Sequence, residues 1–119
     1  MFLQILLSHK GLKEIDIQRS VKVPDPEGKV HPGSREIELD LLCLSPLIVG
    51  ECTSFLAPHK LSKVRTFIAK KRHVESIHKK SSSAYFCTYH ISAEIRNEVL
   101  SLLKEADIVL IEGDRDVDR

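Results

Sequence analysis

The sequence contains no tryptophan, and only 5% of its 119 residues are aromatic. A buried core must therefore be built mainly from Leu, Ile and Val. A platform of aromatic rings, on which unpaired bases could stack, is not evident. No apolar run approaches the ~20 residues that span a membrane, so we expect no membrane association. Residues 1–11 are apolar but lack the basic start and the small-residue cleavage site of a signal peptide.

Cysteine is also scarce, with three residues and no metal-ligand spacing. Cys43, Cys52 and Cys87 all lie in apolar segments typical of strands, which indicates reduced core residues. Reduced cysteines predict a cytoplasmic protein. The chain length fits one domain over residues 1–119, and an apolar content of 42% is ordinary for a globular protein.

The net charge is only +1, but the charge is unevenly distributed. Residues 60–80 contain eight Lys and Arg residues against a single acid, Glu75. This segment therefore carries +7 and the rest of the chain carries −6. A basic block of this kind suits a polyanionic partner. A solvated helix face is the alternative interpretation.

Apolar spacing predicts alternating strands and helices. We expect, in order, a short helix over 1–11, strands over 14–23, 35–45 and 47–54, a helix over 57–80, a strand over 85–90, a helix over 92–106, a strand over 107–112 and a flexible tail over 113–119. An irregularity is expected near Arg19 and Ser20, and a tight turn at Pro46. The first three strands can form an antiparallel meander, and each later strand follows a helix and should add in parallel. The predicted fold class is α/β, with a mixed sheet flanked by helices.

Two acids interrupt the most apolar segment, residues 38–54. Because strand side chains alternate between faces, strict alternation places Glu38, Asp40 and Leu42 together. The tight turn can then bring Asp40 beside Glu51. When two carboxylates lie so near each other, they either share a proton or bind a cation. Mg²⁺ is a suitable cation, with the backbone carbonyl of Cys52 as a third oxygen and water or phosphate as the rest. A solvated strand face is the alternative for both acids.

The stretch "ELDLLCLSPLIVGECTS" resembles the motif of the restriction-endonuclease-like, or PD-(D/E)XK, nuclease superfamily. Asp40 and the run Glu51-Cys52-Thr53 stand in the motif positions, and the element order over residues 12–112 is similar as well. The nearest types are the Mrr-type nucleases and archaeal Holliday-junction resolvases. The resemblance implies a Mg²⁺- or Mn²⁺-dependent phosphodiesterase with Asp40 and Glu51 as metal ligands.

The chain departs from the motif at Thr53, where the family usually has Lys. A neutral hydroxyl cannot offset negative charge as an ammonium does. Some family members carry this lysine on the next helix, where Lys60 or Lys63 could serve. The first helix of the family often carries a Glu, for which residues 1–11 offer only Gln4. The predicted catalytic residues are Asp40, Glu51, Thr53 and Lys63.

The basic helix is expected to contact phosphates with an affinity that depends on salt but not on sequence. Lys63 and Lys70 lie on one flank of the helix, and Arg65 and Arg72 lie on the other. The predicted nucleic-acid-binding residues are Lys60, Lys63, Arg65, Lys70, Lys71 and Arg72. We favour DNA over RNA as the partner.

Three hypotheses follow. The first and favoured one is a metal-dependent nuclease. The second is a catalytically inactive nuclease-fold protein that binds nucleic acid or a protein partner, which Thr53 and the missing Glu support. The third is a structural subunit of a homodimer, in which the basic block is merely solvated.

Overall fold

Strands and helices follow one another in the order that the apolar spacing predicts. The computed structural model describes residues 17–112 of the chain. Its elements are β1 (Gln18–Pro24), β2 (Glu36–Leu44), β3 (Leu47–Leu56), the 3-10 turn η2 (Pro58–Lys60), α2 (Leu61–His78), β4 (Ser83–Ile91), α3 (Arg96–Glu105) and β5 (Ile108–Glu112). The helix expected over residues 1–11, with Gln4, and the expected tail over 113–119 lie outside the described residues.

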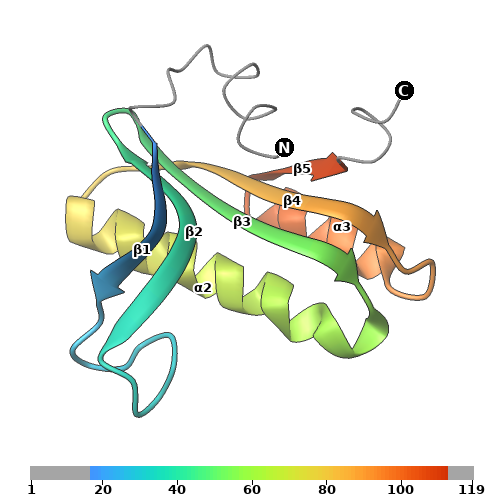
Figure 1. Ribbon diagram of the computed structural model, residues 1–119, viewed down its shortest axis with the longest axis horizontal. Helices are drawn as coiled ribbons and strands as arrows, with labels where there is room; N and C mark the ends of the chain where they lie inside the picture. The colour runs from blue at the N-terminus through green and yellow to red at the C-terminus, as the bar shows by residue number, and fades with distance from the viewer. Residues whose placement is uncertain (1–16, 113–119) are drawn as a thin grey trace.

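The five strands form one mixed sheet in the order β1-β2-β3-β4-β5 (Figure 1). β1, β2 and β3 pair antiparallel, whereas β3, β4 and β5 pair parallel. The parallel pairs arise because α2 and α3 each return the chain to the start of the next strand. The predicted α/β class with a mixed sheet is therefore confirmed. Within residues 17–112, no helix is both long enough and apolar enough to cross a membrane.

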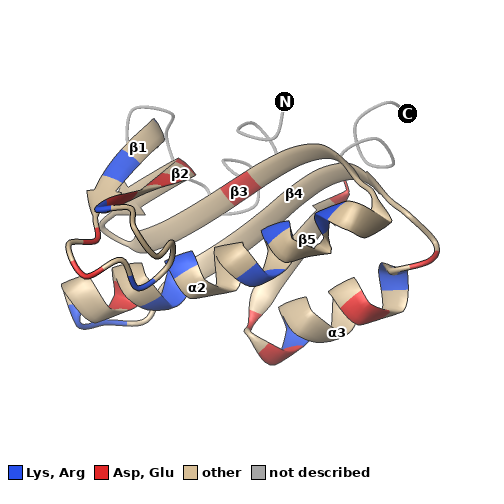
Figure 2. Ribbon diagram, turned by 90° about the horizontal axis from the view of Figure 1, so that it is seen from below, with Lys and Arg blue, Asp and Glu red and all other residues tan. Residues whose placement is uncertain are grey.

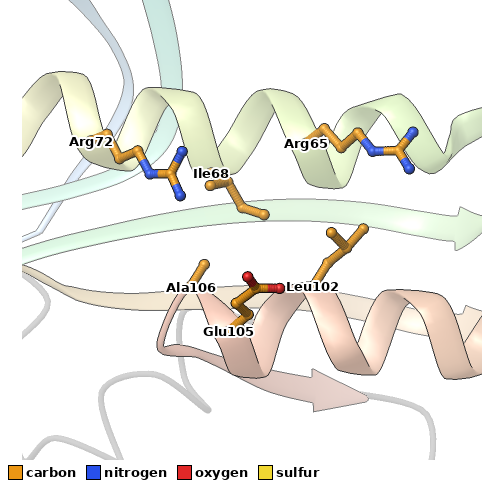
Figure 3. Close-up of a pocket in the computed structure, with 6 residues that line it drawn as sticks. All are labelled: Arg65, Ile68, Arg72, Leu102, Glu105 and Ala106. Atoms are coloured by element: carbon orange, nitrogen blue, oxygen red, sulfur yellow. The ribbon is translucent and has the colours of Figure 1, made fainter.

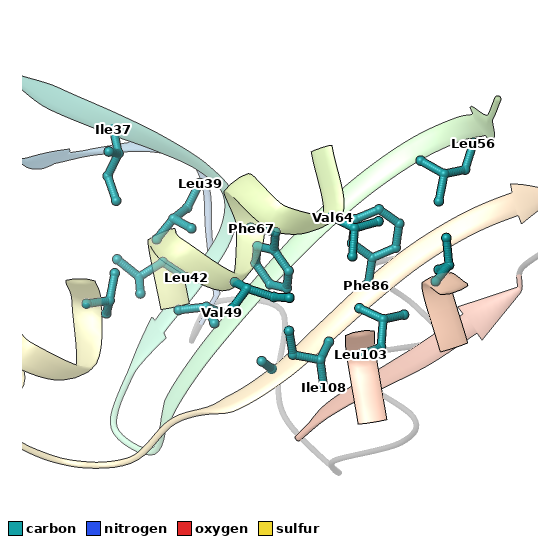
Figure 4. Close-up of a cluster of buried hydrophobic side chains, with 14 of the residues drawn as sticks. Ile37, Leu39, Leu42, Val49, Leu56, Val64, Phe67, Phe86, Leu103 and Ile108 are labelled. Atoms are coloured by element: carbon teal, nitrogen blue, oxygen red, sulfur yellow. The ribbon is translucent and has the colours of Figure 1, made fainter. Parts of the chain in front are cut away.

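α2 and α3 both lie on the same face of the sheet (Figure 2). The main core lies between them and the strands and consists largely of Leu, Ile and Val (Figure 4). Phe67 of α2 and Phe86 of β4 lie at its centre, with ring centroids 6.0 Å apart. A smaller cluster, which includes Leu41, Ile48 and Tyr85, lies on the opposite face. The sheet therefore carries apolar side chains on both faces.

The three cysteines are free thiols, as predicted. Cys43 and Cys87 are buried, and Cys52 is partly exposed. Cys52 and Cys87 are register partners on the parallel strands β3 and β4. The hydrogen bond between these two thiols, together with burial, raises the pKa of the Cys87 thiol, so it remains protonated. Cys43 and Cys87 behave as small core side chains.

The hairpin between β2 and β3 turns at the expected place. Leu44 pairs with Leu47, and the two-residue turn between them contains the cis bond from Ser45 to Pro46. A turn this short leaves no freedom in the register of the hairpin. The pairing of β2 with β3 is consequently set by local geometry.

The irregularity expected near Arg19 and Ser20 is present. Ser20 has φ 51, a conformation that is uncommon for residues other than glycine. Ser20 and Asp40 are missing from the ladder of β1 and β2, although the register is the same on both sides of them. The regular pairing of the two strands is interrupted at this one position.

The interruption corrects one sequence prediction, because strict alternation fails along β2. Leu39 and Leu42 both join the core on the helix side, while Leu41 joins the cluster on the opposite face. Glu38, which is exposed, therefore does not share a face with Leu42. The alternation rule assumes an unbroken ladder, and the ladder breaks at Asp40.

Candidate functional site

β2 and β3 separate at Asp40. Their antiparallel pairing runs from the turn to Leu41 and Gly50 and then stops, so the next pair would be Asp40 with Glu51. Beyond this point β3 continues beside β4, while β2 curves away (Figure 1). The two acids thus face each other at the fork between two diverging strands.

The Asp40 carboxylate takes part in the backbone hydrogen bonding of the fork. Its Oδ2 atom accepts the backbone N–H of Cys52 at 2.8 Å. Where β2 leaves β3, this side chain supplies an acceptor that the backbone of β2 no longer offers. The bond holds Asp40 against β3 and places its carboxylate next to residue 51.

Glu51 meets a lysine from α2. The Nζ atom of Lys70 lies 3.2 Å from Oε2 of Glu51 and donates a second hydrogen bond, of 2.7 Å, to the carbonyl oxygen of Glu38. The side chains of Glu51 and Lys70 are only 15% and 12% exposed, respectively. This ion pair is therefore largely shielded from solvent, unlike the exposed pair between Arg65 and Glu98.

Burial raises the pKa of Glu51 from its ordinary value of 4.5 to about 7. A side-chain hydrogen bond with Asp40 and the negative charge of Asp40 act in the same direction, and Lys70 opposes them. One ammonium thus fails to compensate two neighbouring carboxylates. Near neutral pH, the Glu51 carboxyl is therefore about half protonated, and the pair can accept one further positive charge.

A cavity of about 360 Å³ opens beside the two acids, between the fork and α2. Its lining is polar and comes from four parts of the chain: His31, Asp40, Glu51, Cys52, Ser62, Lys63, Thr66 and Lys70. The expectation that Asp40 and Glu51 lie together agrees with this geometry. Lys63 and Lys70 line the same cavity, as their shared helix flank predicts.

The donor atoms at the fork fit a small hard cation. Two carboxylates that already share a proton can share a divalent ion in its place, and Mg²⁺ commonly takes only one or two carboxylates from a protein. Cys52 also lines the cavity, next to the acids. Within residues 17–112, no group of three or more His, Cys, Asp or Glu side chains is placed to hold a metal ion. Water and substrate oxygens would have to complete the coordination.

Two other residues that the sequence analysis considered for the site lie outside this cavity. Thr53 is buried on β3 opposite Thr88 and does not line the cavity. Lys60 belongs to η2 and is also absent from the lining. Of the two lysines proposed as replacements for the motif lysine, only Lys63 reaches the cavity, and Lys70 lies closer to the acids than the sequence suggested.

The remaining basic residues of α2 do not line the site cavity, and Arg72 lines a cavity against the loop between β1 and β2. Arg65 and Arg72 line a separate cavity of about 270 Å³ against α3, on either side of Ile68 (Figure 3). Lys71 pairs with Glu75 at 2.9 Å, and its side chain is only 11% exposed. Figure 2 shows Lys and Arg distributed along the whole of α2, and packing assigns them to different surfaces.

Sequence reasoning missed His31, Ser62 and Thr66 as cavity residues. His31 comes from the loop between β1 and β2, which no periodic pattern positions. For Thr66 a signal exists, because it lies between Lys63 and Lys70 on one flank of α2. The pairing of Lys70 with Glu51 has no local signal, since it depends on how α2 packs on the sheet.

Comparison with known proteins adds no family assignment to this geometry. No protein-family model matches the chain, and a search of curated proteins finds no match. The function must therefore be inferred from the site.

Proposed function

We propose that this protein is a divalent-metal-dependent nuclease that hydrolyses phosphodiester bonds, and a divergent member of the PD-(D/E)XK superfamily. The supporting observation is that Asp40 and Glu51 meet at the fork of β2 and β3, in a cavity that also contains Lys63 and Lys70. The acids attract a cation, and the neighbouring ammonium groups attract phosphate. Together they form a suitable environment for a phosphodiester.

Each residue has a defined role in this proposal. Asp40 and Glu51 would hold Mg²⁺ or Mn²⁺, and the carbonyl oxygen of Cys52 could serve as a further ligand. An ion held there would supply Lewis-acid chemistry, polarising a phosphodiester and lowering the pKa of a water molecule. Asp40 is held in place by its hydrogen bond from the N–H of Cys52, so its carboxylate needs little reorganisation.

Lys70 takes over the task of the lysine that the motif lacks at Thr53. Its ammonium group lies 3.2 Å from the Glu51 carboxylate, within reach of a phosphate or water bound there. Its bond to the Glu38 carbonyl oxygen holds the long side chain in place. Lys63, on the same flank of α2, offers a second positive charge at the cavity without a partner among the described residues.

A cleavage assay with Mg²⁺ or Mn²⁺ on single-stranded, duplex and branched nucleic acids tests the proposal. Asp40→Asn and Glu51→Gln are expected to abolish cleavage while the protein stays folded, because each replacement keeps the shape of the side chain. Glu105→Gln, on the surface of α3, is the matched control and should cleave normally. Undiminished cleavage by Asp40→Asn would show that another site carries the activity.

A second candidate is a nuclease-fold protein that binds nucleic acid without cutting it. The ion pair of Lys70 with Glu51 favours this candidate, because the ammonium already occupies part of the space that a metal ion needs. This protein would show salt-sensitive binding and no turnover with either metal. Calorimetric binding of Mg²⁺ that disappears in Asp40→Asn would argue against it.

A further inference from the structure

The loop between β1 and β2 is firmly built against α2. The buried carboxylate of Asp25 accepts the backbone N–H groups of Lys29 and Val30, each at 3.0 Å. His73 of α2 bonds to the Pro24 carbonyl oxygen at 2.7 Å. Figure 2 shows this loop beside α2. Residues 29–31 are therefore held in a defined place beside the candidate site.

This loop and α2 enclose two cavities that follow one another along the helix. The first is the site cavity of about 360 Å³, in which His31 faces residues 62–70 of α2. The second, of about 270 Å³, is lined by Lys29 and Val30 of the loop and by residues 69–76 of α2. We call the two cavities together the loop–helix trough. It leads from the acid pair towards the C-terminal half of α2.

The trough is lined by several basic side chains. His31 and Lys63 line its first part, and Lys29 and Arg72 line the second. No acid lines the second part. Lysine and arginine side chains gathered along these two cavities point to an anionic ligand longer than one phosphate group.

We infer that the loop–helix trough binds the sugar–phosphate backbone of a single nucleic-acid strand that leads away from the scissile bond. The inference rests on the proposed function and specifies its substrate class. The loop forms one side of the trough and α2 forms the other. Cavities of this size suit individual nucleotide units better than a duplex. No Phe, Tyr or Trp lines either cavity, so the strand should be held through its phosphates and not by base stacking. Contacts to phosphates do not depend on sequence.

Fluorescence anisotropy with a labelled single strand and a duplex of equal length, in EDTA, tests the inference. The full-length protein is titrated over a series of salt concentrations, so that binding is measured without cleavage. The wild type should bind the single strand more tightly. Lys29→Ala and Arg72→Ala should each weaken this binding about fivefold at about 0.1 M salt and reduce the salt slope by about 0.7, the value for one lost phosphate contact.

Lys104→Ala removes the same charge from α3, outside the trough, and should change neither quantity. The inference is overturned if the duplex binds as tightly as the single strand, if no strand binds, or if Lys104→Ala weakens binding as much as the trough variants do. The proposed nuclease activity fails separately. Binding that responds to Lys29→Ala and Arg72→Ala, without cleavage in Mg²⁺ or Mn²⁺, refutes catalysis and leaves the trough intact.

Discussion

The raised pKa of Glu51 predicts an unusual dependence of stability on pH. In the folded protein this carboxyl releases its proton at about pH 7, against 4.5 ordinarily, because it is buried beside Asp40. Between these two values the folded state retains a proton that the unfolded state has lost. The contribution of Glu51 to the free energy of unfolding is therefore fully present below about pH 4.5 and is lost as the pH rises to about 7. At about 1.4 kcal/mol per pKa unit, the loss amounts to about 3 kcal/mol.

Glu51→Gln isolates this contribution, because glutamine imitates the protonated acid and does not titrate. We expect the stability of the variant relative to the wild type to rise by about 3 kcal/mol from about pH 4.5 to about pH 8. Urea denaturation of both proteins over this range, without divalent ions, measures the difference. Groups that titrate in both proteins cancel in the comparison. Glu105→Gln, an exposed replacement on α3, serves as the control and should give a nearly constant difference.

A difference between Glu51→Gln and the wild type that stays constant over this pH range would refute the reasoning. It would mean that Lys70 fully compensates the two acids, and the case for a cation site at the fork would lose its physical basis. Mg²⁺ provides a second measurement. Because the ion replaces the shared proton, it should stabilise the wild type more strongly as the pH rises and should have little effect on Glu51→Gln.

Three further predictions follow from the same contacts. Lys70→Met removes the cation that bonds to Glu51, so the pKa of Glu51 should rise above about 7, and the pH window of the denaturation experiment should move upward. An unchanged window contradicts the role of Lys70. Asp40→Asn should abolish the Mg²⁺ binding heat in calorimetry while the circular dichroism spectrum stays native, and retained heat would place the ion elsewhere. Phe67→Ala empties the centre of the core and should cost about 3–5 kcal/mol in urea denaturation, whereas Ile77→Ala, at a side chain 46% exposed, should cost far less.

Much of the fold was predictable because its signals are local. The spacing of apolar residues predicts the strands and helices. The two-residue turn at Pro46 fixes the pairing of β2 with β3. The meeting of Asp40 with Glu51 follows from that same turn, since both acids lie in one short hairpin. The prediction of strict alternation along β2 was wrong. The sequence does not show where the ladder is interrupted, nor to which face the side chains on either side of the interruption turn.

The sequence by itself determined the order of the elements, the hairpin that joins the two acids, and the flank of α2 on which each basic residue lies. These follow from local backbone geometry, which a short stretch of chain sets without its neighbours. Only the tertiary structure decided that the flank with Lys63 and Lys70 faces the acids and that the flank with Arg65 and Arg72 faces α3. The rotation of a helix is fixed by how its apolar side chains pack on the sheet, and the position of His31 is fixed by where its loop docks, so neither can be read from spacing alone.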